Sequence, residues 1–207
     1  MCIVAAVLKF FLLSSIGTIC FCDILSMSFV VVGVFGFTCL DNRLYVVYGG
    51  RPTIHVYTAD TFNEVSVITV DGLFDPRDIV ACDDDHQLYV SDQWSSIWQV
   101  SAVNPTDYEN WLTGDELCRD TYTLSLTSRR LLVTPDRSAS LRQYNTVNKQ
   151  LLRVIELPES VKTPTHAVET SRDTFLVSHF QPHSAVSELF SFIVCKFPIS
   201  SLQYHDC

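Results

Sequence analysis

Short apolar runs separated by polar turns dominate the middle of the chain. The clearest example lies between Asp75 and Val100, where three apolar runs alternate with a polar turn and a polar loop. In order, these segments are Asp78–Cys82, Asp83–His86, Gln87–Ser91, Asp92–Ser96 and Ile97–Val100. Runs of about four to six residues bounded by Asp and Ser are typical of strands in a tight antiparallel meander. The pattern therefore predicts three consecutive antiparallel strands.

The same pattern recurs along the chain with a constant period. Its middle strand recurs at steps of 44, 43 and 44 residues, at Leu44–Val46, Leu88–Val90, Leu131–Val133 and Phe175–Val177. The following strand keeps this period at Ile54, Ile97 and Leu141, and Pro76 and Pro164 lie two periods apart. A period of about 40–45 residues that carries four short strands is the signature of a β-propeller blade. We therefore predict an all-β propeller of four-stranded antiparallel blades.

The period divides residues 34–189 into three blades and part of a fourth. The second strands of the blades are expected to centre on Tyr45, Tyr89, Leu132 and Leu176. Side chains that recur in register are expected to pack between blades; these are Ile79, Leu88, Val90, Ile97, Leu131, Val133, Leu141 and Val177. Trp98 aligns with polar residues in the other blades and is predicted to face outward. The fourth blade is expected to reach Val186–Leu189, and residues 190–207 to form a tail outside the repeat.

The residues of the second blade resemble an NHL repeat. The matching segments are Pro76–Asp83, Leu88–Asp92, which reads Leu-Tyr-Val-Ser-Asp, and Ile97–Val100, with a weaker copy over Thr163–His179. NHL repeats usually build six-bladed propellers, and six blades at this period need roughly 260 residues. The resemblance implies blades of the NHL type and a six-bladed propeller. This chain has residues for only about three and a half such blades. We therefore predict an incomplete, open propeller and expect the chain to be a fragment or a truncated product.

Residues 1–28 form an apolar leader that precedes the repeat. Ile3–Leu13 is suited to the apolar region of a secretory signal, with small residues near Cys20 for cleavage, although Lys9 is placed late for such a signal. A membrane anchor and a segment foreign to the natural product are the alternatives. If the leader is genuine, we expect a secreted or membrane-associated protein, with membrane contact only through an uncleaved leader; otherwise we expect a cytoplasmic one.

Charge and cysteine spacing narrow the possible functions. The formal net charge is −9, and the excess acid lies in the repeat region. This argues against a nucleic-acid partner, because phosphate binding needs clustered Lys and Arg. The 8 cysteines show no spacing suited to zinc, so no metal and no cofactor is expected, and the cysteines of the repeats are interpreted as small buried apolar residues. Asp83–Asp85 is interpreted as a solvated turn.

The geometry of a propeller indicates which surface is the best candidate for a binding site. The loop that enters the first strand of a blade and the loop that leaves its second strand share one face. The candidate binding residues on this face are Arg77, Asp78, Asp92, Gln93, Trp94, Arg137, His166 and His179. Asp92 is expected to bond backbone N–H groups of the loop that follows it. Trp94 is the strongest contact candidate, because aromatic residues are enriched at binding hot spots.

No nucleophile elbow, P-loop, H-E-x-x-H motif or dinucleotide fingerprint is present. We therefore predict a non-enzymatic binding or scaffold module that presents loops to a protein partner. One alternative is a fragment of a calcium-dependent propeller hydrolase or lyase, for which Asp78 and His166 are the first-strand candidates. Another, implied by the NHL resemblance, is the substrate-recognition part of a ubiquitin ligase with RING and B-box modules.

Overall fold

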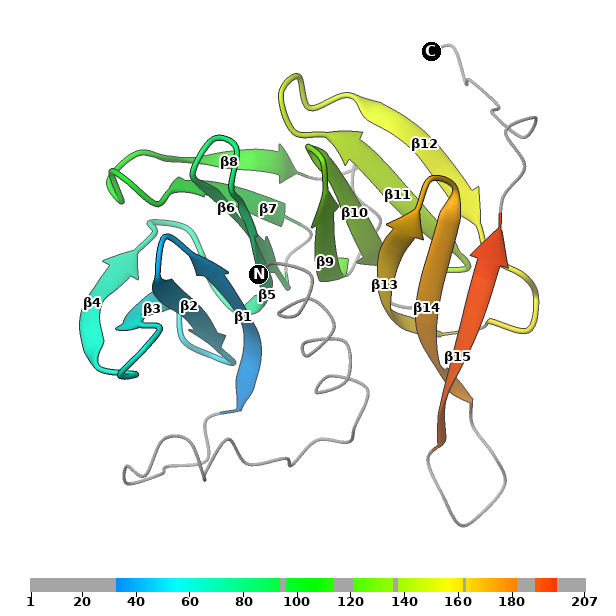
Figure 1. The fold of residues 1–207 in the computed structure, drawn as a ribbon, viewed down its shortest axis with the longest axis horizontal. Helices are drawn as coiled ribbons and strands as arrows, with labels where there is room; N and C mark the ends of the chain where they lie inside the picture. Colours follow the sequence, from blue (N-terminus) through cyan, green and yellow to red (C-terminus); the bar gives the residue numbers. More distant parts are fainter. Residues whose placement is uncertain are drawn as a thin grey trace.

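All regular elements in the described part of the chain are β-strands. The computed structural model describes residues 33–93, 96–113, 121–135, 138–161, 163–181 and 189–196 (Figure 1). The strands form four antiparallel sheets, three of four strands and one of three. No helix long and apolar enough to cross a membrane is found among these residues. The prediction of an all-β chain is confirmed, and the expected leader at residues 1–28 lies outside the described residues.

Each sheet is one blade, built from strands that are consecutive in the sequence. Blade one comprises β1 (Val34–Leu40), β2 (Arg43–Tyr48), β3 (Thr53–Thr58) and β4 (Glu64–Thr69). Blade two comprises β5 (Pro76–Cys82), β6 (Gln87–Asp92), β7 (Ser96–Ser101) and β8 (Tyr108–Thr113). Blade three comprises β9 (Thr121–Thr127), β10 (Arg130–Pro135), β11 (Ser140–Asn145) and β12 (Leu151–Glu156). Blade four comprises β13 (Pro164–Ser171), β14 (Thr174–Gln181) and β15 (Leu189–Lys196).

The blades are arranged as an open propeller. The first strands β1, β5, β9 and β13 are innermost and contact one another in that order, whereas no comparable contact joins β13 to β1 within the described ranges (Figure 1). The second strands of the four blades contain Tyr45, Tyr89, Leu132 and Leu176 respectively, as predicted. The open four-blade arrangement therefore confirms the fold class expected from the period.

The fourth blade extends beyond the boundary expected from the sequence. Its third strand, β15, pairs with β14 along its whole length, from Leu189 opposite Gln181 to Lys196 opposite Thr174. The repeat pattern predicts instead that the fourth blade reaches Val186–Leu189 and that the repeat ends at Leu189. The strand lies later because the connection between β14 and β15 is longer than the corresponding turns in the other blades.

A register shift recurs near the start of every innermost strand. It falls between Val34 and Gly36 in β1, between Pro76 and Asp78 in β5, and between Pro164 and His166 in β13. In β9 it lies at Thr121–Thr123, opposite Pro135 and Thr134. An inserted residue increases the local twist and redirects the side chains that follow it. The residues after the shift, among them Asp78 and His166, therefore occupy equivalent positions on the four inner strands.

The turn between the first and second strands also repeats in detail. Asn42, His86, Arg129 and Asp173 all have positive φ, between 52° and 61°, at steps of 44, 43 and 44 residues. Asn, Asp and His adopt this left-handed conformation more often than most residues, whereas Arg does not favour it. The backbone oxygens of Asn42, His86 and Arg129 accept hydrogen bonds from the turn between the third and fourth strands of the same blade. Blades one to three are therefore closed at this end by the same backbone contact.

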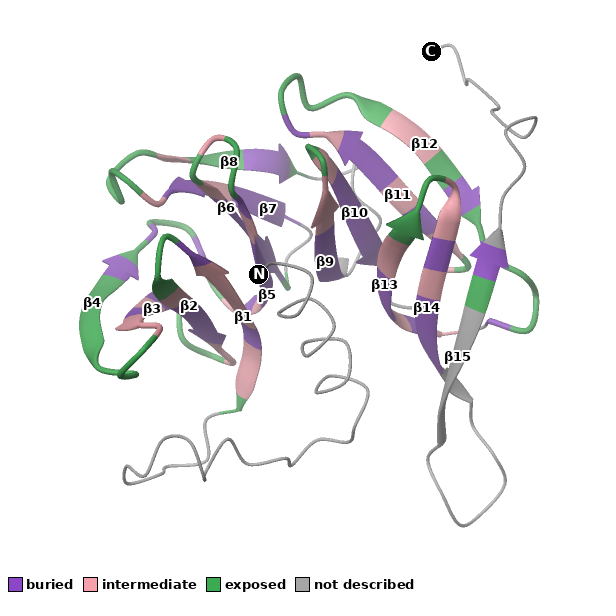
Figure 2. Ribbon diagram, in the orientation of Figure 1, coloured by how far each residue is buried: buried purple, intermediate pink, exposed green. Residues whose placement is uncertain are grey.

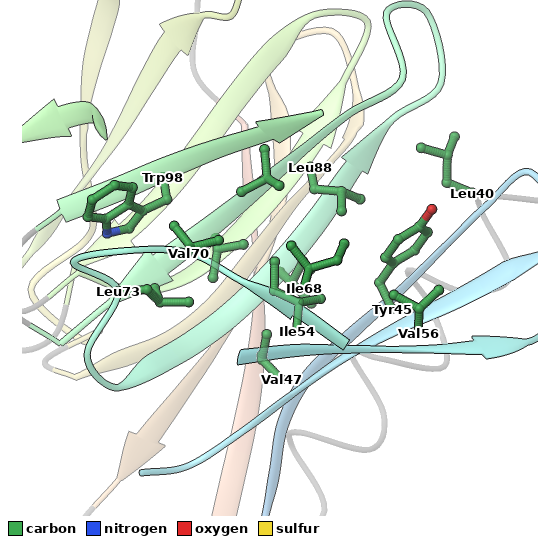
Figure 3. Packing of buried hydrophobic residues seen from close by; sticks show 13 residues of the cluster. Leu40, Tyr45, Val47, Ile54, Val56, Ile68, Val70, Leu73, Leu88 and Trp98 are labelled. Carbon is green, nitrogen blue, oxygen red and sulfur yellow. The ribbon is translucent and has the colours of Figure 1, made fainter. Parts of the chain in front are cut away.

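The core lies between the blades and consists of three apolar clusters. Figure 2 shows buried residues on strands of all four blades. Figure 3 shows the first cluster, between blades one and two, in which Ile54, Ile68 and Leu88 pack together. The second joins blades two and three, and the third joins blades three and four. All eight side chains predicted to pack between blades are at most 1% exposed; they are Ile79, Leu88, Val90, Ile97, Leu131, Val133, Leu141 and Val177. The interblade core is therefore confirmed as predicted.

The predicted orientation of Trp98 was wrong. Its side chain is buried in the first cluster, beside Val70 and Leu73 (Figure 3). These residues belong to the segment that leads from blade one to blade two and folds over β7. Gly72, with φ of 96°, permits this close approach, because a Cβ atom there would lie 2.9 Å from Cη2 of Trp98. The equivalent His55 of blade one is half-buried instead, since no earlier blade among the described residues covers it.

Candidate functional site

We call the surface formed by the loops that enter the first strands and leave the second strands the leading face. Its described residues around blades one and two include Tyr48, Arg51, Phe74, Arg77 and Gln93. Phe74 is 60% exposed, and Arg51 and Gln93 are also exposed. The leading face therefore presents an exposed aromatic ring, a guanidinium group and an amide on loops of the first two blades.

Two buried or half-buried aspartates hold these loops in place. The Oδ2 and Oδ1 atoms of Asp92 accept hydrogen bonds from the backbone N–H groups of Phe74 (3.0 Å) and Asp75 (2.8 Å). Asp75 Oδ1 in turn accepts a hydrogen bond of 2.7 Å from the N–H of Gly50 in blade one. Asp92 thus orders a loop, as predicted, but this loop precedes β5 rather than following β6. The conformation of the leading face is fixed by these bonds.

Arg77 connects the same two blades through its side chain. One guanidinium nitrogen lies 2.9 Å from Asp75 Oδ2, and the group lies over the Phe35 ring at 4.9 Å from its centroid. Phe35 is the inserted residue of the register shift in β1, and its ring packs so closely on Gly49 that a Cβ atom there would lie 2.6 Å away. Arg77 therefore stacks on an aromatic ring and pairs with a carboxylate, a geometry that favours arginine over lysine. The Arg77 side chain remains 24% exposed.

Asp78 is a structural tie between blades rather than a surface residue. It is fully buried, and its Oδ2 accepts a hydrogen bond of 2.8 Å from the backbone N–H of Leu124 in β9. Its Oδ1 accepts one of 2.8 Å from the N–H of Ile79. On the other side Gly36 of β1 approaches so closely that a Cβ atom there would lie 2.6 Å from Oδ1. Asp78 therefore spans three blades at the level of the recurrent register shift.

The two candidate histidines are buried on blade four. His166 follows the register shift in β13, and His179 lies opposite Pro164 in β14. Burial lowers the pKa of His179 below its ordinary value of 6.5, because desolvation disfavours the charged imidazolium. Neither ring reaches the exposed part of the leading face, so both histidines support the blade rather than present a contact.

Burial of His179 predicts a specific dependence of stability on pH. A depressed pKa means that the unfolded chain binds the proton more readily, so the stabilisation is complete above the ordinary pKa of about 6.5 and decreases as pH falls through the window below it. Chemical denaturation of the wild type and of His179→Gln between about pH 7.5 and pH 5.5 measures this effect. We expect the wild type to lose more unfolding free energy than the variant, and parallel curves would contradict the prediction.

Two of the predicted site residues, Trp94 and Arg137, lie outside the described residues. Sequence reasoning missed Phe74, which is the most exposed aromatic residue of the described leading face. The available signal was its position, since Phe74 stands directly before the Asp75-Pro76 pair at the start of β5.

A second buried polar cluster, also missed, joins blades three and four. The Glu169 carboxylate in β13 is 2% exposed and lies 3.4 Å from Arg130 and 3.5 Å from Arg153. Its Oε2 also accepts a hydrogen bond of 3.0 Å from the amide of Gln143. Arg153 pairs in addition with Asp173 in the turn after β13. All these groups are engaged with one another, so this cluster fixes the orientation of blade four.

The face opposite the leading face carries exposed polar contacts between side chains of neighbouring blades. Asp41 lies 2.7 Å from His86, and Asp84 lies 3.0 Å from Arg129, each pair spanning 45 residues. Exposed pairs of this kind contribute little stability. No group of three or more His, Cys, Asp or Glu residues suited to a metal ion is found in the described ranges.

The described cysteines are packing residues. Cys82 and Cys195 are buried in the second and third clusters, and Cys39 is half-buried. Burial, followed by the neighbouring Asp85, raises the pKa of the Cys82 thiol to about 11. Such a thiol is protonated at neutral pH and is a poor nucleophile.

Comparison with known proteins identifies the fold and no family. No protein-family model matches the chain, and neither does any curated protein. Among solved structures 903 chains match, so the fold is a common one that does not by itself select a function.

Two solved structures illustrate the likeness. The chain is similar to Kuenenia stuttgartiensis hydrazine synthase, with a TM-score of 0.60 and 13% identity, over 86% of this chain and 49% of that chain. It is also similar to a chain of a nidogen/laminin complex, with a TM-score of 0.58 and 11% identity, over 74% of this chain and 59% of that chain. The chain thus spans about half to three fifths of the length of these structures, and at such identities the likeness shows the propeller fold alone.

Proposed function

We propose that this chain is a non-enzymatic protein-binding module that contacts its partner through the leading face. The observation that carries the proposal is that Phe74, Arg51 and Gln93 are all exposed on loops that Asp92 and Asp75 link by hydrogen bonds. Aromatic residues and arginine are enriched at hot spots, and a rigid surface loses little conformational entropy when it binds.

The carboxyl groups on and beneath the leading face have structural hydrogen-bond partners, which favours binding over catalysis. Asp78 and Asp92 both accept hydrogen bonds from backbone N–H groups through their two oxygens, and Asp75 is shared between Gly50 and Arg77. Acids held in this way serve as supports for loops. The match to a chain of a nidogen/laminin complex is compatible with a role in protein–protein contact.

We further propose that the blades are of the NHL type and that the natural propeller is six-bladed. The support is the pattern of blade two, with Pro76 opening the first strand and Asp92 closing the second. In the structure Asp92 bonds the loop just before Pro76, which gives both motif residues a shared role in shaping the leading face.

Comparative capture with matched variants tests the leading face. The full chain and the variants Phe74→Ala, Arg51→Ala and Val103→Ala are used as baits in extracts, with quantitative mass spectrometry. Val103 is 75% exposed in the turn between β7 and β8, at the opposite end of blade two, and serves as the control. We expect the amount captured of at least one protein to fall by about tenfold or more, relative to the wild type, with Phe74→Ala and with Arg51→Ala. The amount captured with Val103→Ala should be unchanged. The reason is that truncating a hot-spot residue costs about 2 kcal/mol or more of binding free energy.

Direct binding of the purified partner to the same four chains completes the test. The proposal requires that the two leading-face variants lose affinity while their thermal unfolding stays unchanged. It is contradicted if every captured protein binds the leading-face variants as well as it binds the control.

A further inference from the structure

Asp75 joins three loops of the leading face through its backbone and its side chain. Its N–H group donates a hydrogen bond to Asp92, and its backbone oxygen accepts one of 3.1 Å from the N–H of Gln93. Its carboxylate accepts a hydrogen bond of 2.7 Å from the N–H of Gly50 and lies 2.9 Å from a guanidinium nitrogen of Arg77. We call this group of contacts the Asp75 centre. The three loops therefore meet at one point.

Arg51 and Phe74 lie next to the Asp75 centre in the chain. Arg51 follows Gly50 and Phe74 precedes Asp75, so the hydrogen bond between Gly50 and Asp75 brings the backbones of the two residues close together. Both side chains are exposed, and that of Phe74 is 60% exposed. The leading face therefore carries a basic and an aromatic side chain on two stretches of backbone that contact each other.

Arg51 has no carboxylate partner among the described residues. Its guanidinium carbon lies over the Tyr48 ring, 5.8 Å from the centroid, and the Tyr48 hydroxyl lies 3.0 Å from that of Tyr57. Most other described basic side chains do form ion pairs with carboxylates; these are Arg77, Arg129, Arg130, Lys149, Arg153 and Arg172. In a chain with 23 acidic and 14 basic residues, the Arg51 guanidinium thus keeps its donors for another molecule.

The carboxylates around the Asp75 centre do not neutralise Arg51. The Asp75 side chain is 14% exposed and already has two partners. Asp92 is 1% exposed and is bonded to two backbone N–H groups. Asp71, the exposed acid of the same linker, precedes the glycine that packs on Trp98 of β7. The exposed charge next to the Asp75 centre is therefore that of Arg51.

The net charge of −9 does not exclude an acidic ligand at this point. In blades one and two, acidic residues gather in the turns of the opposite face; they are Asp41, Asp60, Asp83, Asp84, Asp85 and Asp107. A strand of six residues, such as β2, spans roughly 20 Å. The Debye length at physiological ionic strength is about 8 Å. The charges of that face are therefore largely screened at the leading face.

We propose that the leading face recognises a segment of a partner protein in which an acidic side chain lies next to an apolar one. The carboxylate pairs with Arg51, and the apolar side chain packs on Phe74. This inference rests on the proposed function and names the chemistry of the partner. A guanidinium group stacked on an aromatic ring keeps its edge free for a bidentate bond to a carboxylate. Because an exposed ion pair adds little affinity, Phe74 supplies most of the binding free energy and Arg51 supplies the selectivity.

Selection of peptides on the full chain tests the inference. The probe is a phage-displayed library of random dodecapeptides, selected in parallel on the wild type, on Arg51→Glu and on Arg43→Glu. Arg43 is exposed at the start of β2, at the opposite end of blade one, so Arg43→Glu makes the same change of charge away from the leading face. We expect Asp and Glu to be enriched beside apolar residues on the wild type and on Arg43→Glu, and this enrichment to be lost on Arg51→Glu.

A double-mutant cycle locates the contact. A selected peptide is labelled, and its affinity for the full chain is measured by fluorescence anisotropy. Replacing its acidic residue by Gln should weaken binding to the wild type by about three- to tenfold, because a charge-assisted bond at an exposed site contributes about 1 kcal/mol. The same peptide change should have almost no effect on Arg51→Gln, since the partner of the carboxylate is already removed.

The inference is overturned by any of four results. These are absence of a selected peptide that Phe74→Ala weakens, absence of acidic enrichment on the wild type, an equal effect of Arg51→Glu and Arg43→Glu on that enrichment, and additive losses in the cycle. If peptides lose affinity with Phe74→Ala but show no acidic preference, the proposed function stands and only this inference fails. If every selected peptide binds Phe74→Ala and Arg51→Ala as well as the wild type, the leading-face proposal itself fails.

Discussion

Replacing Asp78 by alanine is expected to lower the free energy of unfolding by about 3–5 kcal/mol, the largest effect of any single polar substitution considered for this chain. The carboxyl group accepts hydrogen bonds from the backbone N–H groups of Ile79 and Leu124, and the residue is fully buried. Removing it leaves both donors in the core, and each buried donor without a partner costs about 1–3 kcal/mol. Urea denaturation monitored by tryptophan fluorescence measures the change.

The Asp78→Asn variant separates the hydrogen bonds from side-chain size. Asparagine keeps one acceptor oxygen but turns an amide N–H₂ group toward the second donor, so its cost should lie between those of the wild type and of alanine. Because the bond to Leu124 joins blade two to blade three, the variant should also increase hydrogen exchange in β9 more than in β6. If Asp78→Ala lowers the free energy of unfolding by less than about 1 kcal/mol, the hydrogen bonds of Asp78 do not hold the blades together.

Truncation of Leu88 to alanine is expected to cost about 2–5 kcal/mol. Leu88 is fully buried in the cluster between blades one and two, where it lies beside Ile54 and Ile68 (Figure 3). The cost combines lost burial of apolar surface with the cavity that rigid neighbouring strands cannot fill. Chemical denaturation of the full chain gives the value.

Val103→Ala is the matched control for this truncation, because Val103 is exposed in a turn of the same blade. Its unfolding free energy should stay within about 0.5 kcal/mol of the wild type. A change well below 1 kcal/mol at Leu88 would mean that blades one and two do not pack as the register requires.

Period and apolar alternation were sufficient to predict the strands and the core. The residues Tyr45, Tyr89, Leu132 and Leu176 lie on second strands, and the eight recurring apolar residues are buried between blades. Strand position depends on local pattern, and burial depends on register, so both can be obtained from the sequence. Trp98 was predicted wrongly because its cover comes from a linker whose path depends on Gly72.

Less of the candidate site than of the fold could be predicted from the sequence. Asp92 was recognised as a support for a loop, but which loop it bonds depends on the bend between β4 and β5. Glu169 was missed because its partners Arg130 and Arg153 lie on other strands at no fixed spacing. Phe74 was missed because it lies in a loop between two blades, where the repeat pattern does not apply. The exposure of its side chain depends on how the neighbouring loops pack, and the sequence does not give this packing.

The open arrangement of the four blades is tested most directly by measuring the mass of the full chain in solution over a wide range of protein concentration. Leu44 in blade one is half-buried, whereas its equivalents Leu88 and Leu131 are fully buried. Val194 in blade four is 60% exposed, whereas Val56 and Gln143 at the equivalent positions of blades one and three are 1% exposed. Uncovered apolar faces of this kind favour association. We expect a mass above that of one chain that rises with concentration, together with a thermal transition that depends on concentration. A monomer with a sharp, concentration-independent transition would contradict the open arrangement.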